Sequence, residues 1–316
     1  MGHRPGRARL PRCDAIGDEG DDGLTRWGTV STVLAQPRDV ARFIAWHLSL
    51  GAADMQVFLD RPNPALADRL AHPRVTFHHC DDAHWARAPA KARSTHQRRQ
   101  AHNATRAYRR SQVDWLLHID VDEFLLGGFT APPGEIARIR PAELLMGSGW
   151  PERGLFKKSR RAAGQSPEVH ASLHPAFGEI VPDGMLSYGG GKIALKTGRE
   201  GIRLGLHHAA QQGEKLRAPV TDQMLIGHAH APSPEAFAAH RAFRAAKGSY
   251  RAQGKPNALG AALDVLEAEG RLPDFLTEVA SATPARLDLY RAHDMLVDVD
   301  MDLDTKVTEI FGEAPL

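Results

Sequence analysis

Residues 114–127 read DWLLHIDVDEFLLG, and the expected fold and function both follow from this stretch. The apolar run 115–119 has the length of a buried strand and ends in three carboxylates, Asp120, Asp122 and Glu123. Carboxylates this close together repel one another and resist desolvation, and a divalent cation commonly offsets both effects. Alternate residues of an extended segment face one side, so Asp120 and Asp122 can bind one ion, and their oxygens suit Mg²⁺ or Mn²⁺. The alternative is an acidic loop that binds nothing.

The composition excludes several classes of protein. The chain has 316 residues, 42% of them hydrophobic, which suits one large α/β domain or one domain with appendages. Its net charge of +2 gives no field that would select a nucleic acid. Only Cys13 and Cys80 occur, so we expect no structural disulfide and a cytoplasmic location. No apolar run approaches the ~20 residues of a membrane helix, which leaves peripheral membrane contact as the only kind expected.

Strands and helices alternate at the start of the chain. The pattern is strand, helix, strand, helix, strand, over residues 29–34, 40–50, 55–59, 65–70 and 75–78. Such alternation predicts a parallel α/β sheet that binds ligands beyond the carboxyl ends of its strands. Gln36, Asp60 and Asp81 each follow a strand, so we expect them at the same edge as the acidic turn.

The segment WLLHIDVDEFL resembles the Asp-x-Asp segment of family 2-like glycosyltransferases, a GT-A group that also resembles family 92. Two further matches are Trp46-His47-Leu48, shortly before a Leu-Gly pair, and Asp60 after the second strand. The chain departs from the family at Ala35-Gln36, where an Asn-Glu pair is typical. The resemblance implies a GT-A fold with a Rossmann-like, mostly parallel sheet flanked by helices. It also implies a nucleotide-sugar donor held by Mn²⁺ or Mg²⁺ at the two aspartates.

The resemblance also suggests donor contacts outside the acidic turn. Asp60 would accept from the base or the ribose, although an Asp in this position often only caps a turn. Residues 92–110 are predicted to form one long polar helix on which Arg99, Gln100 and Asn103 share a side. The family carries a Gln and an Asn at this spacing, and an arginine here could reach a diphosphate. The alternative is a solvated surface helix, and its few aromatic residues make a nucleic-acid surface a poor interpretation.

Three segments in the middle of the chain carry weaker expectations. Three glycines precede Lys192 without the spacing of a P-loop, so we expect a tight turn with Lys192 on the rim of the acceptor site, in reach of the donor. A short helix ending at Ile139 and a strand over 142–146 are predicted after the acidic turn. The polar and basic segment 152–165 is predicted to be a mobile loop that closes over bound donor.

A second informative segment lies near residue 230. Residues 225–228 are predicted to end a strand at His228, and a helix over 234–247 follows with Ser233 as its N-cap. The family 92 pattern has a His, a Ser and a Glu-x-Phe at these offsets, which implies that His228 is a third metal ligand beside the two aspartates. His230 lies outside that pattern. A lone His is otherwise a satisfied polar residue.

These features together predict a metal-dependent glycosyltransferase of the hexosyltransferase type. It would move a sugar from a nucleotide-diphosphate-sugar donor to a glycan or lipid-linked acceptor, as in cell-surface polysaccharide synthesis. The expected domain spans 26–250, between a disordered leader, 1–25, and a C-terminal helical extension, 251–316, packed on the same domain. An inverting enzyme needs a carboxylate base, for which Asp183 and Asp222 are candidates. The alternatives are a non-catalytic nucleotide-sugar binding module and a metal-dependent phosphohydrolase that uses the same acids.

Overall fold

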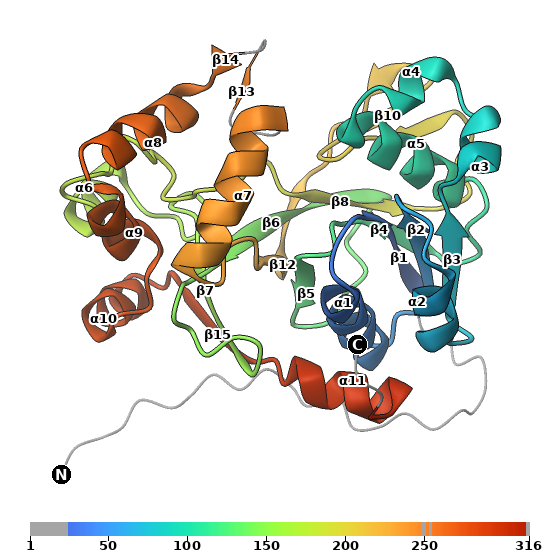
Figure 1. Cartoon of the computed structure of the whole chain (residues 1–316), viewed down its shortest axis with the longest axis horizontal. Helices are drawn as coiled ribbons and strands as arrows, with labels where there is room; N and C mark the ends of the chain where they lie inside the picture. Colours follow the sequence, from blue (N-terminus) through green and yellow to red (C-terminus); the bar gives the residue numbers. More distant parts are fainter. Residues whose placement is uncertain (1–24, 248–250, 253–254, 314–316) are drawn as a thin grey trace.

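A computed structural model of the chain describes residues 25–247, 251–252 and 255–313. The expected leader therefore lies almost wholly outside the described residues. The architecture is mixed α/β, with a curled and largely parallel central sheet flanked by helices (Figure 1). Among the described helices, none combines the length and the apolar character needed to cross a bilayer.

The first part of the chain folds as its alternating pattern predicts. The elements are β1 (Trp27–Val33), α1 (Pro37–Ser49), β2 (Asp54–Leu59), α2 (Pro64–Arg69) and β3 (Val75–His79). Strands β1 and β2 pair in parallel, and so do β2 and β3. Gly28 is required at its position in β1, because a Cβ there would lie 2.3 Å from the backbone oxygen of Asp54.

The order of the parallel strands reverses beside β1. Strand β4 (Trp115–His118) pairs with β1 on the side away from β2, which gives the order β3-β2-β1-β4. The chain thus leaves β1 in one direction and returns to its other side. A crevice outside the carboxyl ends of strands at such a switch point is where open α/β sheets bind ligands. The acidic turn directly follows β4, so it lies at this point.

The single long helix expected over 92–110 is wrong. The structure has α3 (Asp82–Ala86), α4 (Ala90–Arg93) and α5 (His96–Tyr108) instead. The break falls at Thr95, whose extended backbone and side chain cap α5 by accepting from the backbone nitrogen of Arg98 at 3.3 Å. A threonine in this conformation satisfies a helix end more easily than it continues a helix.

Two expectations for residues 132–165 are also wrong. The short helix to Ile139 and the strand over 142–146 are one strand, β6 (Ile136–Leu144). The segment expected to be a mobile lid contains β7 (Arg153–Lys158), which pairs with β6. Within β7, Phe156 is fully buried and Lys157 is only 1% exposed, so this segment is part of the core.

The remaining strands complete the sheet. Strand β8 (Lys192–Lys196) lies antiparallel between β4 and β6, which confirms a strand after the glycines. Strand β12 (Val220–His228) runs parallel to β6 and antiparallel to β5 (Glu123–Leu126), with His228 opposite Glu123. Strand β9 (Ile202–Leu204) forms a small separate sheet with β10 (Ala209–Gln211) and β11 (Glu214–Lys215).

The C-terminal region is more than a helical extension. It holds α7 (Pro234–Lys247), α8 (Ala258–Ala268), α9 (Leu272–Ala280), α10 (Pro284–Ala292) and α11 (Leu303–Phe311), with the short pair β13 (Arg251–Ala252) and β14 (Lys255–Pro256). Strand β15 (Leu296–Asp300) pairs with β7 and forms one edge of the central sheet. Helix α11 lies beside α1, where Asp304 accepts from Arg42 at 2.7 and 2.8 Å. Residues 296–311 are therefore built into the main body.

Helices cover the sheet on two faces. Phe43 and Ile44 of α1 share a core with Leu117 of β4, and Val307 of α11 joins it. Ala104 of α5 and Leu116 of β4 belong to a second core on the opposite face. Figure 1 shows α1 and α11 on one side of the strands and α5 on the other. Successive residues of β4 thus point into different cores, as alternation along a strand requires.

Candidate functional site

The acidic turn is fixed against the end of β1. The backbone nitrogen of Ile119 donates to the oxygen of Val30 at 3.3 Å, and the buried hydroxyl of Ser31 donates to the oxygen of Ile119 at 2.7 Å. Asp120 follows immediately. The carboxylates therefore start at the carboxyl edge of the two central parallel strands.

The exit from the turn is held by α1. The indole nitrogen of Trp46 donates to the oxygen of Leu125 at 2.9 Å, and the nitrogen of Leu125 donates to Nε2 of His47 at 3.2 Å. Since Nε2 accepts, Nδ1 of His47 carries the proton and donates to the oxygen of Phe43 at 2.8 Å. Complete burial lowers the pKa of His47 to about 4, so the ring stays neutral. Trp46 and His47 thus position β5 and do not face a ligand.

A buried lysine neutralises two of the three acids. Nζ of Lys192 lies 2.6 Å from Oδ2 of Asp120 and 3.0 Å from Oε2 of Glu123. Lys192 is 1% exposed, so the expectation that it lies on the rim of an acceptor site is wrong. Its backbone belongs to β8, which runs between β4 and β6 and directs the side chain inwards.

The electrostatics of this ion cluster are mutually dependent. Burial by itself lowers the pKa of Lys192, but Asp120 and Glu123 outweigh burial and raise it. Burial likewise opposes ionisation of Asp120, yet Lys192 holds the pKa of that carboxyl below its usual value. For Glu123 burial prevails over Lys192, and its pKa is raised. Asp120 and Lys192 therefore form the charged pair at the centre of the cluster.

Each carboxylate oxygen of Asp120 already accepts one hydrogen bond from the protein. Gln100 donates to its Oδ1, and Lys192 occupies its Oδ2. Glu123 is similarly occupied, because Tyr188 donates to Oε1 and the backbone nitrogen of Asp120 donates to Oε2 at 2.7 Å. The predicted contact of Gln100 with this region is thus found, although its partner is the protein's own carboxylate.

Asp122 is the most exposed of the three acids, with a side chain that is 34% exposed, against 27% for Asp120 and 0% for Glu123. Its Oδ2 lies 3.3 Å from Nε2 of His228, which is the residue that the family pattern singles out. Burial lowers the pKa of His228, but Asp122 reverses that effect and raises it. The same pairing, against burial, holds the pKa of Asp122 below its usual value. The tertiary structure therefore brings two of the three predicted metal ligands, Asp122 and His228, together where β5 begins and β12 ends.

Sequence reasoning missed the residues that hold His228. Its Nδ1 lies 3.1 Å from Oγ of Ser187. The carboxylate of Glu143 in β6 accepts from the backbone nitrogens of Ser187 at 2.5 Å and Leu186 at 2.8 Å. Glu143 is only 3% exposed. A carboxylate within an apolar run, as in AELLM, was the signal in the sequence, because such a group needs buried donors.

His230 lies next to His228 at the end of β12. It is 2% exposed, and the centres of the two imidazole rings are 4.8 Å apart. Within the part of the chain that the structure describes, neither ring nitrogen of His230 has a hydrogen-bond partner. Burial lowers the pKa of His230 strongly, so the ring is neutral.

Asp60 lines a pocket of about 330 Å³ at the same edge of the sheet. Arg99 donates to both of its carboxylate oxygens, at 2.8 and 2.6 Å. The lining residues are Leu34, Asp60, Arg61, Trp85, Arg93 and Arg99. Burial by itself raises the pKa of Asp60, but hydrogen bonds from His96 and Arg99 outweigh it and lower the pKa to about 2. Gln36 is exposed at the start of α1 and makes no capping bond there.

Two predicted contacts have structural roles instead. Asn103 is fully buried, donates to the hydroxyl of Thr32 at 3.0 Å and lies 3.0 Å from Nε2 of His84. It therefore ties α5 to the sheet and cannot reach a donor. Asp81 accepts from the backbone nitrogen of His84 at 2.7 Å and caps α3.

The two candidate bases lie in different surroundings. The side chain of Asp183 is 24% exposed, and its carboxylate accepts from the backbone nitrogen of Arg161 at 3.2 Å. A Cβ on Gly189 would lie 3.3 Å from it, so Asp183 borders the glycine loop before Lys192. Asp222 is exposed near the start of β12, six residues and on the order of 15–20 Å along the strand from His228. Asp222 is therefore too remote to serve the acidic turn.

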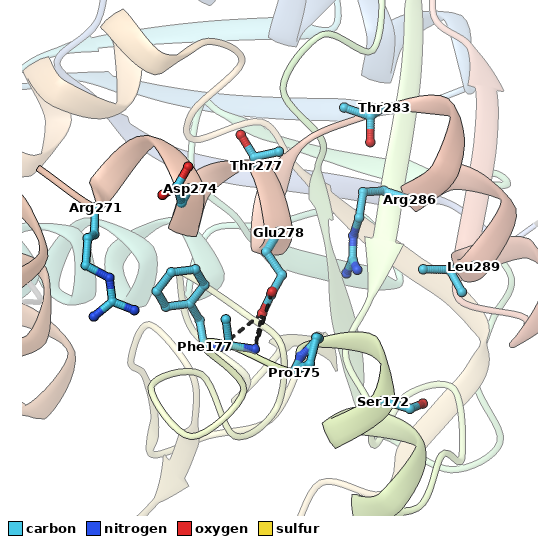
Figure 2. A pocket seen from close by; sticks show the side chains of 11 residues that line it. Ser172, Pro175, Phe177, Arg271, Asp274, Thr277, Glu278, Thr283, Arg286 and Leu289 are labelled. Carbon is cyan, nitrogen blue, oxygen red and sulfur yellow. Dashed lines mark hydrogen bonds between the residues drawn. The ribbon is translucent and has the colours of Figure 1, made fainter.

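A larger cavity of about 540 Å³ lies elsewhere, beside α9, α10 and α6 (Pro167–Leu173). Figure 2 shows Glu278 directed towards the backbone of Phe177, with Arg271 and Arg286 on either side. The nitrogen of Phe177 donates to that carboxylate at 3.0 Å, and Arg286 donates to His174 and Tyr290 at 3.2 and 2.8 Å. Glu278 and Arg286 thus already have hydrogen-bond partners within the protein. The smaller pocket, not this one, lies at the carboxyl ends of the parallel strands.

In the described part of the chain, no three His, Cys, Asp or Glu side chains already surround a single metal position. Lys192 explains this in part, because it takes the place of a cation between Asp120 and Glu123. No protein-family model matches the chain, and no curated protein matches it significantly in sequence.

Replacing Lys192 should destabilise the protein much more than replacing a lysine of a surface ion pair. We expect Lys192→Met to lower the free energy of unfolding by about 3–5 kcal/mol, since Asp120 and Glu123 lose their buried counter-charge. The control is Lys158→Met, whose partner Asp294 has an 87% exposed side chain and where the loss should stay below about 1 kcal/mol. Urea denaturation at neutral pH measures both. Equal losses in the two variants would contradict the central role of Lys192.

Asp60 should make stability depend on pH in the acid range. Its folded pKa of about 2 is below the ordinary value of 3.8, so its contribution is present above pH 3.8 and is lost as the pH falls towards 2. The loss should be about 2 kcal/mol, because the side chain is only 5% exposed. Unfolding free energies of the wild type and Asp60→Asn across this window provide the test. An Asp60→Asn variant with an unchanged acid slope would refute the assignment.

Proposed function

We propose that the protein is a metal-dependent glycosyltransferase of the GT-A type, cytoplasmic, that uses a nucleotide-diphosphate-sugar donor and a glycan or lipid-linked acceptor. The observation that carries this proposal is the place of Asp122. It is the most exposed acid of the turn, it lies at the switch point between β1 and β4, and it contacts His228. The likeness of WLLHIDVDEFL to the Asp-x-Asp segment agrees with that position.

The donor set around Asp122 fits a divalent metal ion. Its carboxylate and the imidazole of His228 are 3.3 Å apart, and both are ligand types that Mn²⁺ accepts. When bound, the metal would neutralise the charge that develops on the departing diphosphate. Lys192 would not replace it in that task, because this lysine is committed to Asp120 and Glu123.

Other residues of the protein would bind the nucleoside, orient Asp120 and accept the proton of the acceptor. The pocket of Asp60, Arg99 and Trp85 would hold the nucleoside, with the indole as an apolar wall. Gln100 and Lys192 would keep Asp120 oriented beneath the donor. Asp183, beside the glycine loop, is the better-placed candidate for a base that takes the acceptor proton.

Incubation of the purified protein with a panel of nucleotide sugars and Mn²⁺ tests the reaction class. We expect slow release of nucleoside diphosphate, which increases when a suitable acceptor is added. Release of orthophosphate instead would indicate a phosphohydrolase. Donor binding without any turnover would indicate a non-catalytic module. Either of the last two results would overturn the proposal.

Asp122→Asn tests the role of the exposed acid. We expect turnover to fall by at least about a hundredfold while the protein stays folded, with a moderate loss of stability because the charged pair with His228 is broken. The control is Asp298→Asn, which removes a 40% exposed carboxylate from the pair with Arg153 on the edge strand. Steady-state kinetics and thermal unfolding of both variants give the answer. An Asp122→Asn enzyme with full activity would exclude Asp122 as a ligand.

A further inference from the structure

His230 has an unusual environment for a buried side chain. Both of its ring nitrogens lack a hydrogen-bond partner among the described residues, and the residue is 2% exposed. Each buried polar atom without a partner destabilises a fold by about 1–3 kcal/mol. A phenylalanine or leucine would fill the same space without that penalty. The free nitrogens therefore point to a ligand that they meet in another state of the protein.

The location of His230 identifies where such a ligand would bind. Its ring lies 4.8 Å from the ring of His228, whose Nε2 is 3.3 Å from Oδ2 of Asp122. His228 is the last residue of β12, and His230 follows two residues later, in the bend beyond the strand. Since the side chain of Asp122 is 34% exposed, the group is open to solvent at that residue.

The charge at this place favours a cation over an anion. Asp120 is paired with Lys192, and Glu123 accepts from Tyr188 and from the backbone nitrogen of Asp120. The carboxylate of Asp122 therefore remains for the imidazole of His228, beside which the ring of His230 lies. A second negative group beside Asp122 would be repelled.

We propose that His230 joins His228 and Asp122 as a ligand of one transition-metal dication, and that the site therefore selects Mn²⁺, Co²⁺ or Zn²⁺ over Mg²⁺. Imidazole nitrogens suit the first group of ions, whereas Mg²⁺ prefers oxygen ligands and keeps its waters. This inference rests on the metal that the proposed function requires, and it specifies the class of ion.

The existing contacts of His228 agree with this role. Two ligands held at about 2.1 Å from one ion are roughly 3 Å apart, close to the 3.3 Å between Nε2 of His228 and Oδ2 of Asp122. The ion would thus replace the proton that His228 shares with Asp122. Ser187, 3.1 Å from Nδ1, would fix the orientation of the ring, as partners of metal-bound histidines commonly do.

Metal titration of tag-free, metal-stripped protein tests the inference. Mn²⁺, Co²⁺ and Mg²⁺ are titrated separately by calorimetry, with and without a nucleoside diphosphate, and Co²⁺ binding is also followed by its visible absorption. We expect Mn²⁺ and Co²⁺ to bind at least about tenfold tighter than Mg²⁺. His230→Phe should weaken both by about tenfold or more, change Mg²⁺ binding less than about twofold and leave the metal-free protein at least as heat-stable as the wild type.

His174→Phe is the matched control. His174 is 1% exposed and its Nε2 also lacks a partner among the described residues, but it lies in the region of α6 beside Arg286. This variant should bind metal as the wild type does. The inference is overturned if His230→Phe keeps wild-type Co²⁺ and Mn²⁺ affinity, if Mg²⁺ binds as tightly as Mn²⁺, or if the wild type binds none of the three ions.

The titration separates this inference from the proposed function. Selective metal binding that depends on His230, without release of nucleoside diphosphate from any donor, supports the metal site and refutes the transferase. Sugar transfer that proceeds equally well with Mg²⁺ and in His230→Phe supports the transferase and refutes the role of His230.

Discussion

The buried contact between Lys192, Asp120 and Glu123 is the interaction on which the rest of the site depends. Three carboxylates within four residues cannot be enclosed by a sheet unless a positive charge accompanies them. Strand β8 supplies that charge from 72 residues further along the chain. Because β8 lies between β4 and β6, the cluster also fixes where the parallel half of the sheet meets the mixed half. The positive charge of Lys192 is therefore needed both for the acidic turn and for the packing of β8 in the sheet.

This arrangement divides the acids by role. Asp120 and Glu123 accept from protein donors and hold the turn, whereas Asp122, the most exposed of the three acids, meets His228. The same division explains why no metal position is already formed in the described residues, since Lys192 performs part of the work of a cation. Trp46 hydrogen-bonds the backbone of β5, so the turn is held from its exit as well. Hydrogen bonds at both ends of the turn fix its backbone, and Asp122 is the acid of the turn that stays most accessible to a ligand.

The second half of the chain supplies the other wall of the site. Glu143 in β6 binds the backbone of Ser187, and Ser187 contacts His228. These residues come from segments far apart in sequence that meet only because β12 pairs with both β5 and β6. On the opposite side, Asp60 and its pocket follow β2. The position of Asp122 between these two walls is what the switch point of the sheet creates.

The sequence by itself determined the local features of this protein. Alternating apolar runs predicted the first three strands and helix α1, Ser233 predicted the start of α7, and the acidic turn with His228 predicted the centre of the candidate site. Tertiary structure decided what depends on partners distant in the chain. Strand β7 reads as a polar loop because its lysines mask the pattern, and only pairing with β6 and β15 makes it a strand. Likewise, Lys192 and Asn103 could have faced solvent, and packing alone buried them, because burial depends on which elements the fold brings against a residue.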